Sequence, residues 1–396
     1  MIRAFATSLT FNVAGAALSG IAVLIVVATL APNEWGSAAA ILGAGQFIGA
    51  ALSFGSQTER VRRYSRLEAN HFSECVGQES STRAGFATLL ALLAVGLFLF
   101  WPAAGATLLA AAGVFMSLGT TNHLIAQMRY VSAGLVLVAE KVVVAAVVLG
   151  AILFDSLAVE TLPSVVGVAG LIVGIGVLVK IRPRRRMLFA ALRPREVLAM
   201  WTGSFYIGLA SLAPSALLLD VIIVATIAGT TEAGVFALAS RLTAPLSVAA
   251  TAVVAVLLPH MASSKARTVP RPSRRGVVAL VVLVVILSVI MLTAELWVMS
   301  LFGDNYAEAV WPVRLYILNV IVILGTRALV TVLQAWDDER FVGWLVVGQV
   351  LAALVGIAIG AHLGAAFGAS VAVLATNLVL LGCLGFRVRR VGTVGG

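Results

Sequence analysis

The amino-acid sequence predicts an all-α integral membrane protein in which twelve transmembrane helices form two six-helix bundles, with both termini in the cytoplasm. Three observations support this fold class: the composition, the distribution of basic residues and an internal repeat. Hydrophobic residues make up 61% and charged residues 11% of the 396 residues. A soluble domain is about 45–50% apolar and about 25% charged. The surface of this protein is therefore adapted to lipid rather than to water.

Hydropathy predicts twelve helices, each near or above the ~20 apolar residues that a transmembrane helix needs. Their predicted ranges are 5–30, 35–57, 84–101, 104–127, 131–154, 161–181, 197–228, 234–258, 276–299, 308–335, 341–361 and 366–386. The first apolar segment is too long for the core of a signal peptide, so we interpret it as a retained first span.

The lysine and arginine residues indicate the orientation of these spans, because basic residues concentrate in cytoplasmic loops. With the N-terminus inside, every loop residue among the 27 Lys and Arg falls on the inner side. The remaining four lie within predicted spans, at Lys141, Arg241, Arg314 and Arg327.

Most tryptophans are interpreted as membrane-interface anchors. Trp35, Trp101, Trp297 and Trp311 fall at predicted outer ends, and Trp201, Trp336 and Trp344 fall at or near inner ends.

The two halves of the chain carry a repeat at their first outer turns. The segment NEWGSAA resembles TEAGVFA, so that Gly36 corresponds to Gly234 with an offset of 198 residues. Glu34 likewise corresponds to Glu232. An even number of spans per half gives both halves the same orientation, so the repeats are parallel and related by an axis along the membrane normal.

This repeat predicts an N-terminal bundle at 1–181 and a C-terminal bundle at 197–396. Between them, apolar residues among clustered arginines predict an amphipathic cytoplasmic linker at 182–196. Two bundles joined in this way are typical of transporters, in which one bundle rocks against the other around a central cavity.

Charged residues inside the spans are the candidate site. Glu295 and Arg314 lie near outer ends, where they can reach water. The deeper ones are Glu140, Lys141, Asp220, Arg241 and Arg327. An unpaired charge at the membrane centre costs roughly 2.5–3.5 kcal/mol on insertion scales, so such residues are expected to pair or to line a wet cavity.

Asp220 and Arg241 lie at similar distances from the turn between helices seven and eight, which places them at similar depth. We expect an ion pair. It either locks the helical hairpin or presents Arg241 to an anionic head group, with Asp220 orienting it. For Glu140 and Lys141, near the midplane, one side chain is expected to face the cavity and the other a neighbouring helix, or the two neutralise each other. Arg327 either snorkels to the inner surface or lines the cavity.

Other chemistries find little support. Cys75 and Cys383 are predicted at different depths, which argues against a disulfide, and no metal or cofactor site is expected. The net charge of +10 is interpreted as basic loops facing anionic lipid, not as a nucleic-acid surface. The sequence shows no plausible catalytic triad or exposed pair of catalytic acids, so an enzyme is not expected.

Three segments resemble bacterial polysaccharide exporters, the lipid-linked oligosaccharide flippases of the multidrug/oligosaccharidyl-lipid/polysaccharide (MOP) exporter superfamily. They are LAPNEWGSAAAILGAGQFIGAALSFGSQTERVRRYSR (30–66), LDVIIVATIAGTTEAGVFALASRLTAPLSVAATAVVAVLLPHMAS (219–263) and LFGDNYAEAVWPVRLYILN (301–319). The resemblance implies a flippase for a polyprenyl-pyrophosphate-linked oligosaccharide in the bacterial cytoplasmic membrane. Arg241, Arg327 and Lys141 would then contact the diphosphate, with Asp220 and Glu140 beside them. The implied partners are the glycan lipid, membrane lipids and glycan-assembly proteins, and a monomer is expected.

Two alternatives stay open. A cation-coupled multidrug exporter of the same superfamily would favour acids such as Asp220 and Glu140 in its cavity. A membrane glycosyltransferase or polymerase would be expected to carry a large loop with catalytic carboxylates, whereas the longest predicted loop, 58–83, is basic and faces inward.

Overall fold

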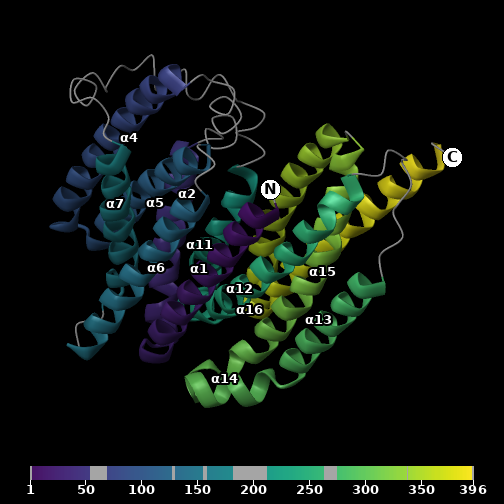
Figure 1. Cartoon of the computed structure of the whole chain (residues 1–396). Helices are drawn as coiled ribbons and strands as arrows, with labels where there is room; N and C mark the ends of the chain where they lie inside the picture. The colour runs from purple at the N-terminus through teal and green to yellow at the C-terminus, as the bar shows by residue number, and fades with distance from the viewer. Residues whose placement is uncertain are drawn as a thin grey trace. The chain divides into compact units, whose positions relative to one another are not determined.

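The structure is a computed structural model that describes residues 2–53, 69–126, 130–154, 158–181, 212–262, 274–336 and 338–394. Within these ranges the regular structure is helical, without strands (Figure 1). The helices are α1 (Ile2–Thr29), α2 (Pro32–Ser53), α4 (Ala69–Phe98), α5 (Pro102–Ala126), α6 (Tyr130–Leu153), α7 (Thr161–Ile181), η1 (Leu217–Leu219), α11 (Asp220–Ala228), α12 (Thr230–Ala262), α13 (Arg274–Leu292), α14 (Ala294–Phe302), η2 (Asp304–Ala309), α15 (Val310–Ala335) and α16 (Glu339–Val394).

Several of these helices suit a membrane. Six in the described ranges are long and apolar enough to cross one, or seven if the bent pair α13 and α14 is a single span. The sixth is α16, whose helical geometry breaks at Gly364 and Ala365, where two separate spans were predicted. The twelve-span count and the cytoplasmic termini stay predictions. The predicted linker at 182–196 lies outside the described residues.

Two predicted helices differ from the observed ones. The third helix begins at Ala69 rather than at residue 84, so α4 extends well into the predicted inner loop. The predicted ninth span bends by 57° at Thr293 and continues as α14. There the Trp297 indole N–H donates a hydrogen bond to the Ile290 carbonyl, 3.1 Å away, on the other side of the bend.

The chain divides into two compact units. Unit 1 comprises residues 1–29 and 37–222, and unit 2 comprises 30–36 and 223–396. In each unit we call the end that carries the predicted outer turns the outer end. The predicted domain boundaries differ slightly from these units and stay a prediction.

In unit 1, α5 packs against α4 and α7, and α1 packs along α6. Small residues allow this close packing. A Cβ on Gly113 of α5 would lie 2.2 Å from the carbonyl oxygen of Gly167 on α7. Gly45 of α2 meets α5 in the same way, 2.7 Å from the carbonyl oxygen of Thr107. Helix backbones are therefore in contact where larger side chains would hold them apart.

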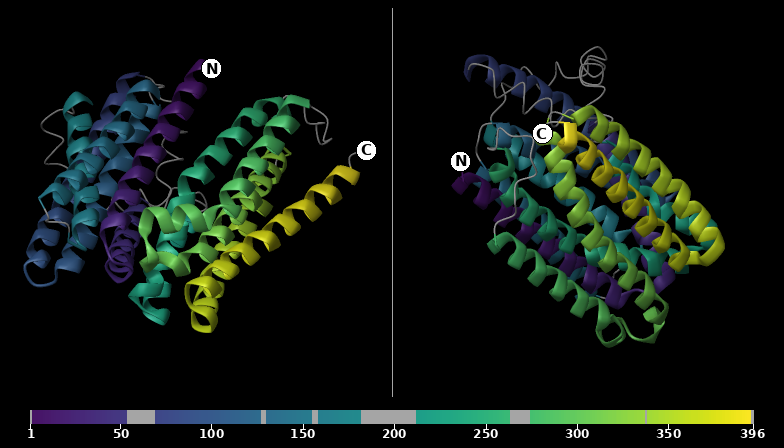
Figure 2. Two further views of the ribbon diagram at one scale, coloured as in Figure 1. Left: turned by 90° about the horizontal axis from the view of Figure 1, so that it is seen from below. Right: turned by 90° about the vertical axis from the view of Figure 1, so that its right-hand side faces the viewer.

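In unit 2, α15 packs against α12, α13 and α16 (Figure 1). α16 folds back on itself at its kink (Figure 2), where Gly360 and Gly368 bring the two arms together. Away from the outer end an apolar core joins α15 to both arms of α16. It consists of Val332, Leu333, Val342, Leu380, Leu384 and Val388.

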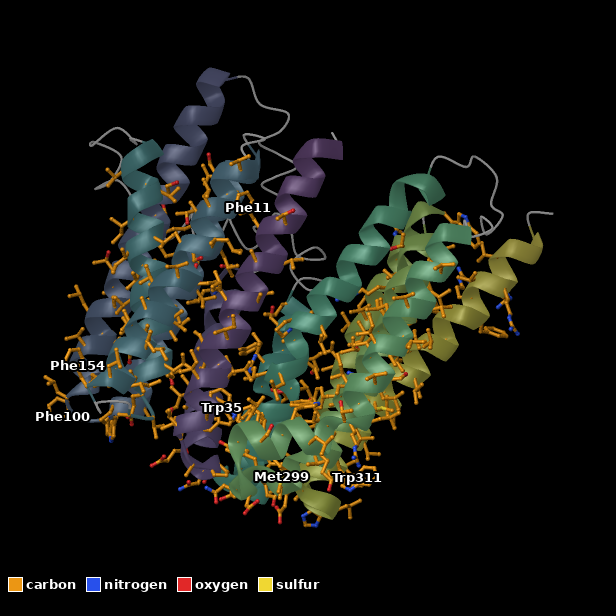
Figure 3. All side chains as sticks on the ribbon, turned by 60° about the horizontal axis from the view of Figure 1, so that its bottom comes forward. Phe11, Trp35, Phe100, Phe154, Met299 and Trp311 are labelled. Atoms are coloured by element: carbon orange, nitrogen blue, oxygen red, sulfur yellow. The ribbon has the colours of Figure 1, made fainter. Side chains whose placement is uncertain are left out.

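The tryptophans follow the prediction in part. Trp101, Trp311 and Trp344 are exposed, as membrane-interface anchors require. Trp35 is fully buried, so its interpretation as a lipid-facing anchor was wrong. Figure 3 labels Trp35 together with Met299 and Trp311 toward the outer end of unit 2. Trp35 is a packing residue of that end.

Candidate substrate-binding site

One face of α12 carries the main candidate. Thr230, Gly234, Ala237 and Arg241 follow one another at spacings of four, three and four residues, which places them on a single helical stripe. At the outer end this stripe touches the start of α2, because Gly234 meets the backbone of Pro32. Arg241 lies seven residues further in, about 10 Å along the helix axis. We call this face the Arg241 stripe.

The guanidinium of Arg241 lacks partners for two of its nitrogens. Nε and Nη2 are both buried, and neither makes a hydrogen bond. An unsatisfied buried polar group costs about 1–3 kcal/mol, and a charged group costs more. A guanidinium presents its donors in a planar fork that matches the oxygens of phosphate and carboxylate. At Arg241 two donors of this fork are thus unsatisfied in the described structure.

α15 carries two further polar residues. The rings of Phe236 on α12 and Tyr316 on α15 meet edge to face with centroids 5.6 Å apart, which aligns the two helices in depth. Both helices run inward from the outer end. Arg327 lies eleven residues beyond Tyr316 and on nearly the same face, and its side chain is exposed. By this register Arg327 is about 9 Å further inward than Arg241.

Asn319, about two turns before Arg327 on α15, is a further site candidate. Its side chain is 4% exposed, and its Oδ1 oxygen is buried without a hydrogen-bond partner. From the same alignment of α12 and α15, Asn319 lies within a turn of the depth of Arg241. Unit 2 therefore holds unsatisfied donors and an unsatisfied acceptor at similar depth.

Asp220 begins α11, directly after the short 3-10 helix η1. Its Oδ1 oxygen accepts a hydrogen bond from the backbone N–H of Val221 at 2.7 Å. Asp220 belongs to unit 1 and Arg241 to unit 2, so their predicted ion pair stays a prediction.

Glu140 and Lys141 form an ion pair with each other inside α6. The Lys141 Nζ lies 2.7 Å from Oε1 of Glu140, and the Ser117 hydroxyl of α5 donates a hydrogen bond to Oε2. Glu140 is buried, and the side chain of Lys141 is 28% exposed. The structure thus shows mutual neutralisation, the second of the two arrangements considered for this pair. Lys141 is less available to a ligand than Arg241.

Arg83 is a buried cation that sequence reasoning placed in the inner loop. It lies in α4 and is 1% exposed. Its Nη1 donates to the Phe115 carbonyl at 3.0 Å and to the Ser53 hydroxyl at 3.5 Å, and the guanidinium stacks 4.8 Å from the centre of the Phe115 ring. Between Gly77 and the apolar run that begins at Ala84, the chain contains no proline and no glycine. This is the sequence signal that α4 could begin before residue 84.

At the outer end, Arg314 and Glu295 pair at 3.4 Å, and Arg314 stacks on Trp311. The Glu295 side chain is 70% exposed, as expected for a residue that reaches water. Among the described residues, no group of three His, Cys, Asp or Glu side chains could hold a metal ion.

No protein-family model matches the chain, and no curated protein matches its sequence. Solved structures do match. An inward-facing multidrug resistance MATE family transporter of the MOP superfamily is 14% identical, with a TM-score of 0.67 over 96% of each chain. The lipid II flippase MurJ, in an inward closed conformation, is 10% identical, with a TM-score of 0.55 over 96% of this chain and 87% of that chain.

A MOP superfamily transporter from Pyrococcus furiosus, described as having a binding pocket of reverse polarity, is 12% identical. Its TM-score is 0.55 over 99% of this chain and 96% of that chain. The chain has the fold of MOP superfamily transporters. These neighbours are transporters and flippases rather than enzymes. At such low sequence identity the similarity to MOP superfamily structures establishes the fold alone. The substrate has to be inferred from the residues of the candidate site.

Proposed function

We propose that this protein is a flippase that moves a polyprenyl-pyrophosphate-linked oligosaccharide across the bacterial cytoplasmic membrane by alternating access. The observation that carries the proposal is Arg241, whose buried Nε and Nη2 atoms have no hydrogen-bond partner. A diphosphate supplies the oxygen acceptors that these donors lack, and it matches the geometry of the guanidinium fork. The loss of an unsatisfied buried charge then contributes to the binding free energy.

Arg327 extends this site inward. A difference in depth of about 9 Å lets two arginines contact different parts of one elongated head group. Lys141 contributes less in this proposal, because Glu140 already neutralises it. Asp220 and Glu140 act through the cations beside them and not by contact with the diphosphate. The polyprenyl tail stays in the lipid while the charged head crosses along polar side chains.

The proposal includes the predicted topology, in which twelve spans form two parallel bundles with cytoplasmic ends. The basic inner side attracts anionic head groups at the cytoplasmic leaflet, where long-range attraction raises the local substrate concentration. Glycan-assembly enzymes are the expected neighbours, and the protein is proposed to act as a monomer without a cofactor.

A cation-coupled multidrug exporter is the second candidate, and the acids of unit 1 favour it. Such a transporter needs a carboxylate that exchanges a cation. Glu140 is the buried acid in α6, but one of its oxygens binds Lys141 and the other accepts from Ser117. The unsatisfied groups at Arg241 are donors, which repel cations. Loss of transport on removing Arg241 therefore separates the two candidates.

The test is complementation of a bacterial strain that lacks its own flippase, scored together with protein abundance. Arg241→Ala is expected to reduce transport at least a hundredfold. Protein abundance should stay near normal, because few hydrogen-bond acceptors lose a partner when the guanidinium is removed. Arg241→Lys is expected to restore part of it, since a point charge cannot bind a diphosphate through two parallel bonds. Arg314→Ala removes an arginine at the outer end and is the matched control, with transport expected to persist.

Reconstitution in liposomes with a fluorescent lipid-linked sugar gives a second measurement. The rate at which the fluorescent lipid-linked sugar crosses the liposome membrane should fall in Arg241→Ala and in Arg327→Ala. Uptake of a lipophilic cation should be absent in all variants. Full activity of the Arg241→Ala, Arg327→Ala double variant at normal abundance would rule out a diphosphate site at these positions.

A further inference from the structure

A buried acceptor on α15 has no partner within the part of the chain that the structure describes. The Asn319 side chain is 4% exposed, and its Oδ1 oxygen makes no hydrogen bond. The Thr326 hydroxyl, two turns further along the same helix, is also buried but donates to the Val322 carbonyl at 3.0 Å. Buried polar atoms are nearly always hydrogen-bonded, so the Asn319 oxygen needs an explanation.

The contact between Phe236 and Tyr316 shows on which side of the helix pair this oxygen lies. The two rings meet with centroids 5.6 Å apart, so each points toward the other helix. Both helices run inward, and successive residues of a helix turn by about 100°. Ser240 therefore lies about 40° from the Phe236 direction, and Asn319 lies about 60° from the Tyr316 direction in the opposite sense. In a parallel pair of helices, opposite senses place both residues on the same side.

Arg241 lies on this side of α12 as well, about 140° from the Phe236 direction. Counted from the ring contact, Arg241 is about 3 Å further inward than Asn319. Its Nε and Nη2 atoms and the Asn319 oxygen all lack hydrogen-bond partners, so they do not bond to one another. Ser240 lies between them and donates its hydroxyl to the Ala237 carbonyl at 3.2 Å. All of these residues belong to unit 2.

The two unsatisfied groups have opposite hydrogen-bonding character. The guanidinium of Arg241 only donates, whereas the Oδ1 atom of Asn319 only accepts. A fully ionised diphosphate satisfies the first and has no donor for the second. An uncharged polar molecule can satisfy the second, but it leaves the charge of the first without a counter-charge. A ligand that satisfies both carries an anionic oxygen and, close to it, an O–H or N–H group. A sugar joined directly to a diphosphate has these two features side by side.

We infer that Asn319 is a specificity-determining residue that accepts a hydrogen bond from the sugar joined to the diphosphate, through a hydroxyl or an acetamido N–H. Arg241 binds the diphosphate beside it, and the lone pair that the Ser240 oxygen retains is a second acceptor for the same sugar. A site built to accept such a bond rejects an analogue without the donor, because its buried acceptor is then left unsatisfied. This inference rests on the proposed function for the diphosphate at Arg241 and adds the recognition of the first sugar.

The test compares two ligands of equal charge on the full-length protein purified in detergent. One is a short-chain polyprenyl glucosyl diphosphate, and the other is the corresponding methyl diphosphate, which has no donor. Microscale thermophoresis gives both affinities. The parent protein is expected to bind the glucosyl ligand about tenfold more tightly. Asn319→Leu should bind both ligands alike, at the affinity that the parent has for the methyl ester.

The thermal-unfolding midpoint separates recognition from a structural role of the amide. In Asn319→Leu the midpoint should stay level or rise, because an apolar group of similar size replaces an unsatisfied buried acceptor. Asn319→Ala removes the amide without adding bulk, and it gives the same comparison of ligands if the leucine variant does not fold. Thr326→Val is the matched control. It removes a buried hydroxyl of α15 that bonds to its own helix, so the preference for the glucosyl ligand should persist.

Two results would overturn the inference: equal affinities of the parent protein for both ligands, or a preference that persists in the folded Asn319 variants. Arg241→Ala should weaken binding of both ligands by the same factor and leave their ratio unchanged. Unchanged binding of both ligands in Arg241→Ala would instead contradict the proposed diphosphate site. Failure of the sugar contact and failure of the proposed function are therefore distinguishable in the same measurement.

Discussion

The guanidinium of Arg83 fills the space above Gly119: a Cβ on Gly119 would lie 2.5 Å from Cδ and 2.8 Å from Nη1 of Arg83. Gly119 on α5 thus makes room for a buried arginine on α4. The hydrogen bond from Arg83 to the Phe115 carbonyl joins the same two helices. Arginine and glycine here form one packing unit between two adjacent helices.

Gly119→Ala is therefore expected to destabilise unit 1. The added methyl group overpacks the site, which costs about 1–3 kcal/mol, although alanine favours a helix more than glycine does. Thermal unfolding in detergent should show a lower midpoint. Gly176→Ala on α7 is the control, because a Cβ there meets open space, and its midpoint should stay level or rise. Equal midpoints for the two variants would contradict the packing role.

Glu140→Gln is expected to lower the stability of the folded protein by about 1–3 kcal/mol. It leaves the Lys141 ammonium, 2.7 Å away, without its counter-charge inside a membrane helix. Glu140→Gln combined with Lys141→Met removes both charges and should recover much of the loss, because the two residues act as a coupled pair. Thermal-unfolding midpoints measured for the two single variants and for the double variant give the coupling between the two residues. Additive effects would show that the pair does not act as a unit.

The predicted Asp220–Arg241 pair can be tested by exchange of charge. Asp220→Asn should reduce the yield of folded protein, because it removes an acid that offsets Arg241. Exchange of the two residues should restore part of the yield. Arg241→Ala is expected to cost less, since Asp220 keeps the hydrogen bond from the Val221 backbone N–H. The pair does not exist if both neutralised variants and the exchanged protein express alike.

The topology predicts which positions an impermeant thiol reagent reaches from outside. Single cysteines at Asn33, Ala158, Thr231 and Asn305 should be labelled in intact cells, because these residues are exposed at predicted outer turns. A cysteine at Arg340 should be labelled only after the cells are opened. Labelling of the Arg340 position in intact cells would show that the orientation or the number of spans is wrong.

The sequence by itself determined the membrane class and the approximate position of most helices. The thickness of the bilayer imposes a segment of about 20 apolar residues, and this signal is local in the chain. Accordingly the predicted ranges for α5, α6, α7 and α15 lie within a few residues of the observed helices. The correspondence of Gly36 and Gly234 was also visible, because repeats preserve spacing.

The limits of the prediction come from properties that local hydropathy does not record. A polar stretch can be helical and buried when the tertiary structure supplies partners, as Phe115 and Ser53 do for Arg83. For Glu140 and Lys141 the sequence left two arrangements open, and only the structure shows that their charged ends meet. Trp35 looked like a lipid anchor because its depth was right, and only packing shows that protein covers it.

Only the tertiary structure decided which backbones touch. Glycine appears 37 times in the chain, and its position in the sequence does not say which copies lie against another helix. Gly36 and Gly234 meet the backbone of the other repeat, whereas Gly96 and Gly150 face open space. Contact between segments distant in sequence depends on the three-dimensional path of both, so it is a property of pairs of segments that no single stretch of sequence contains.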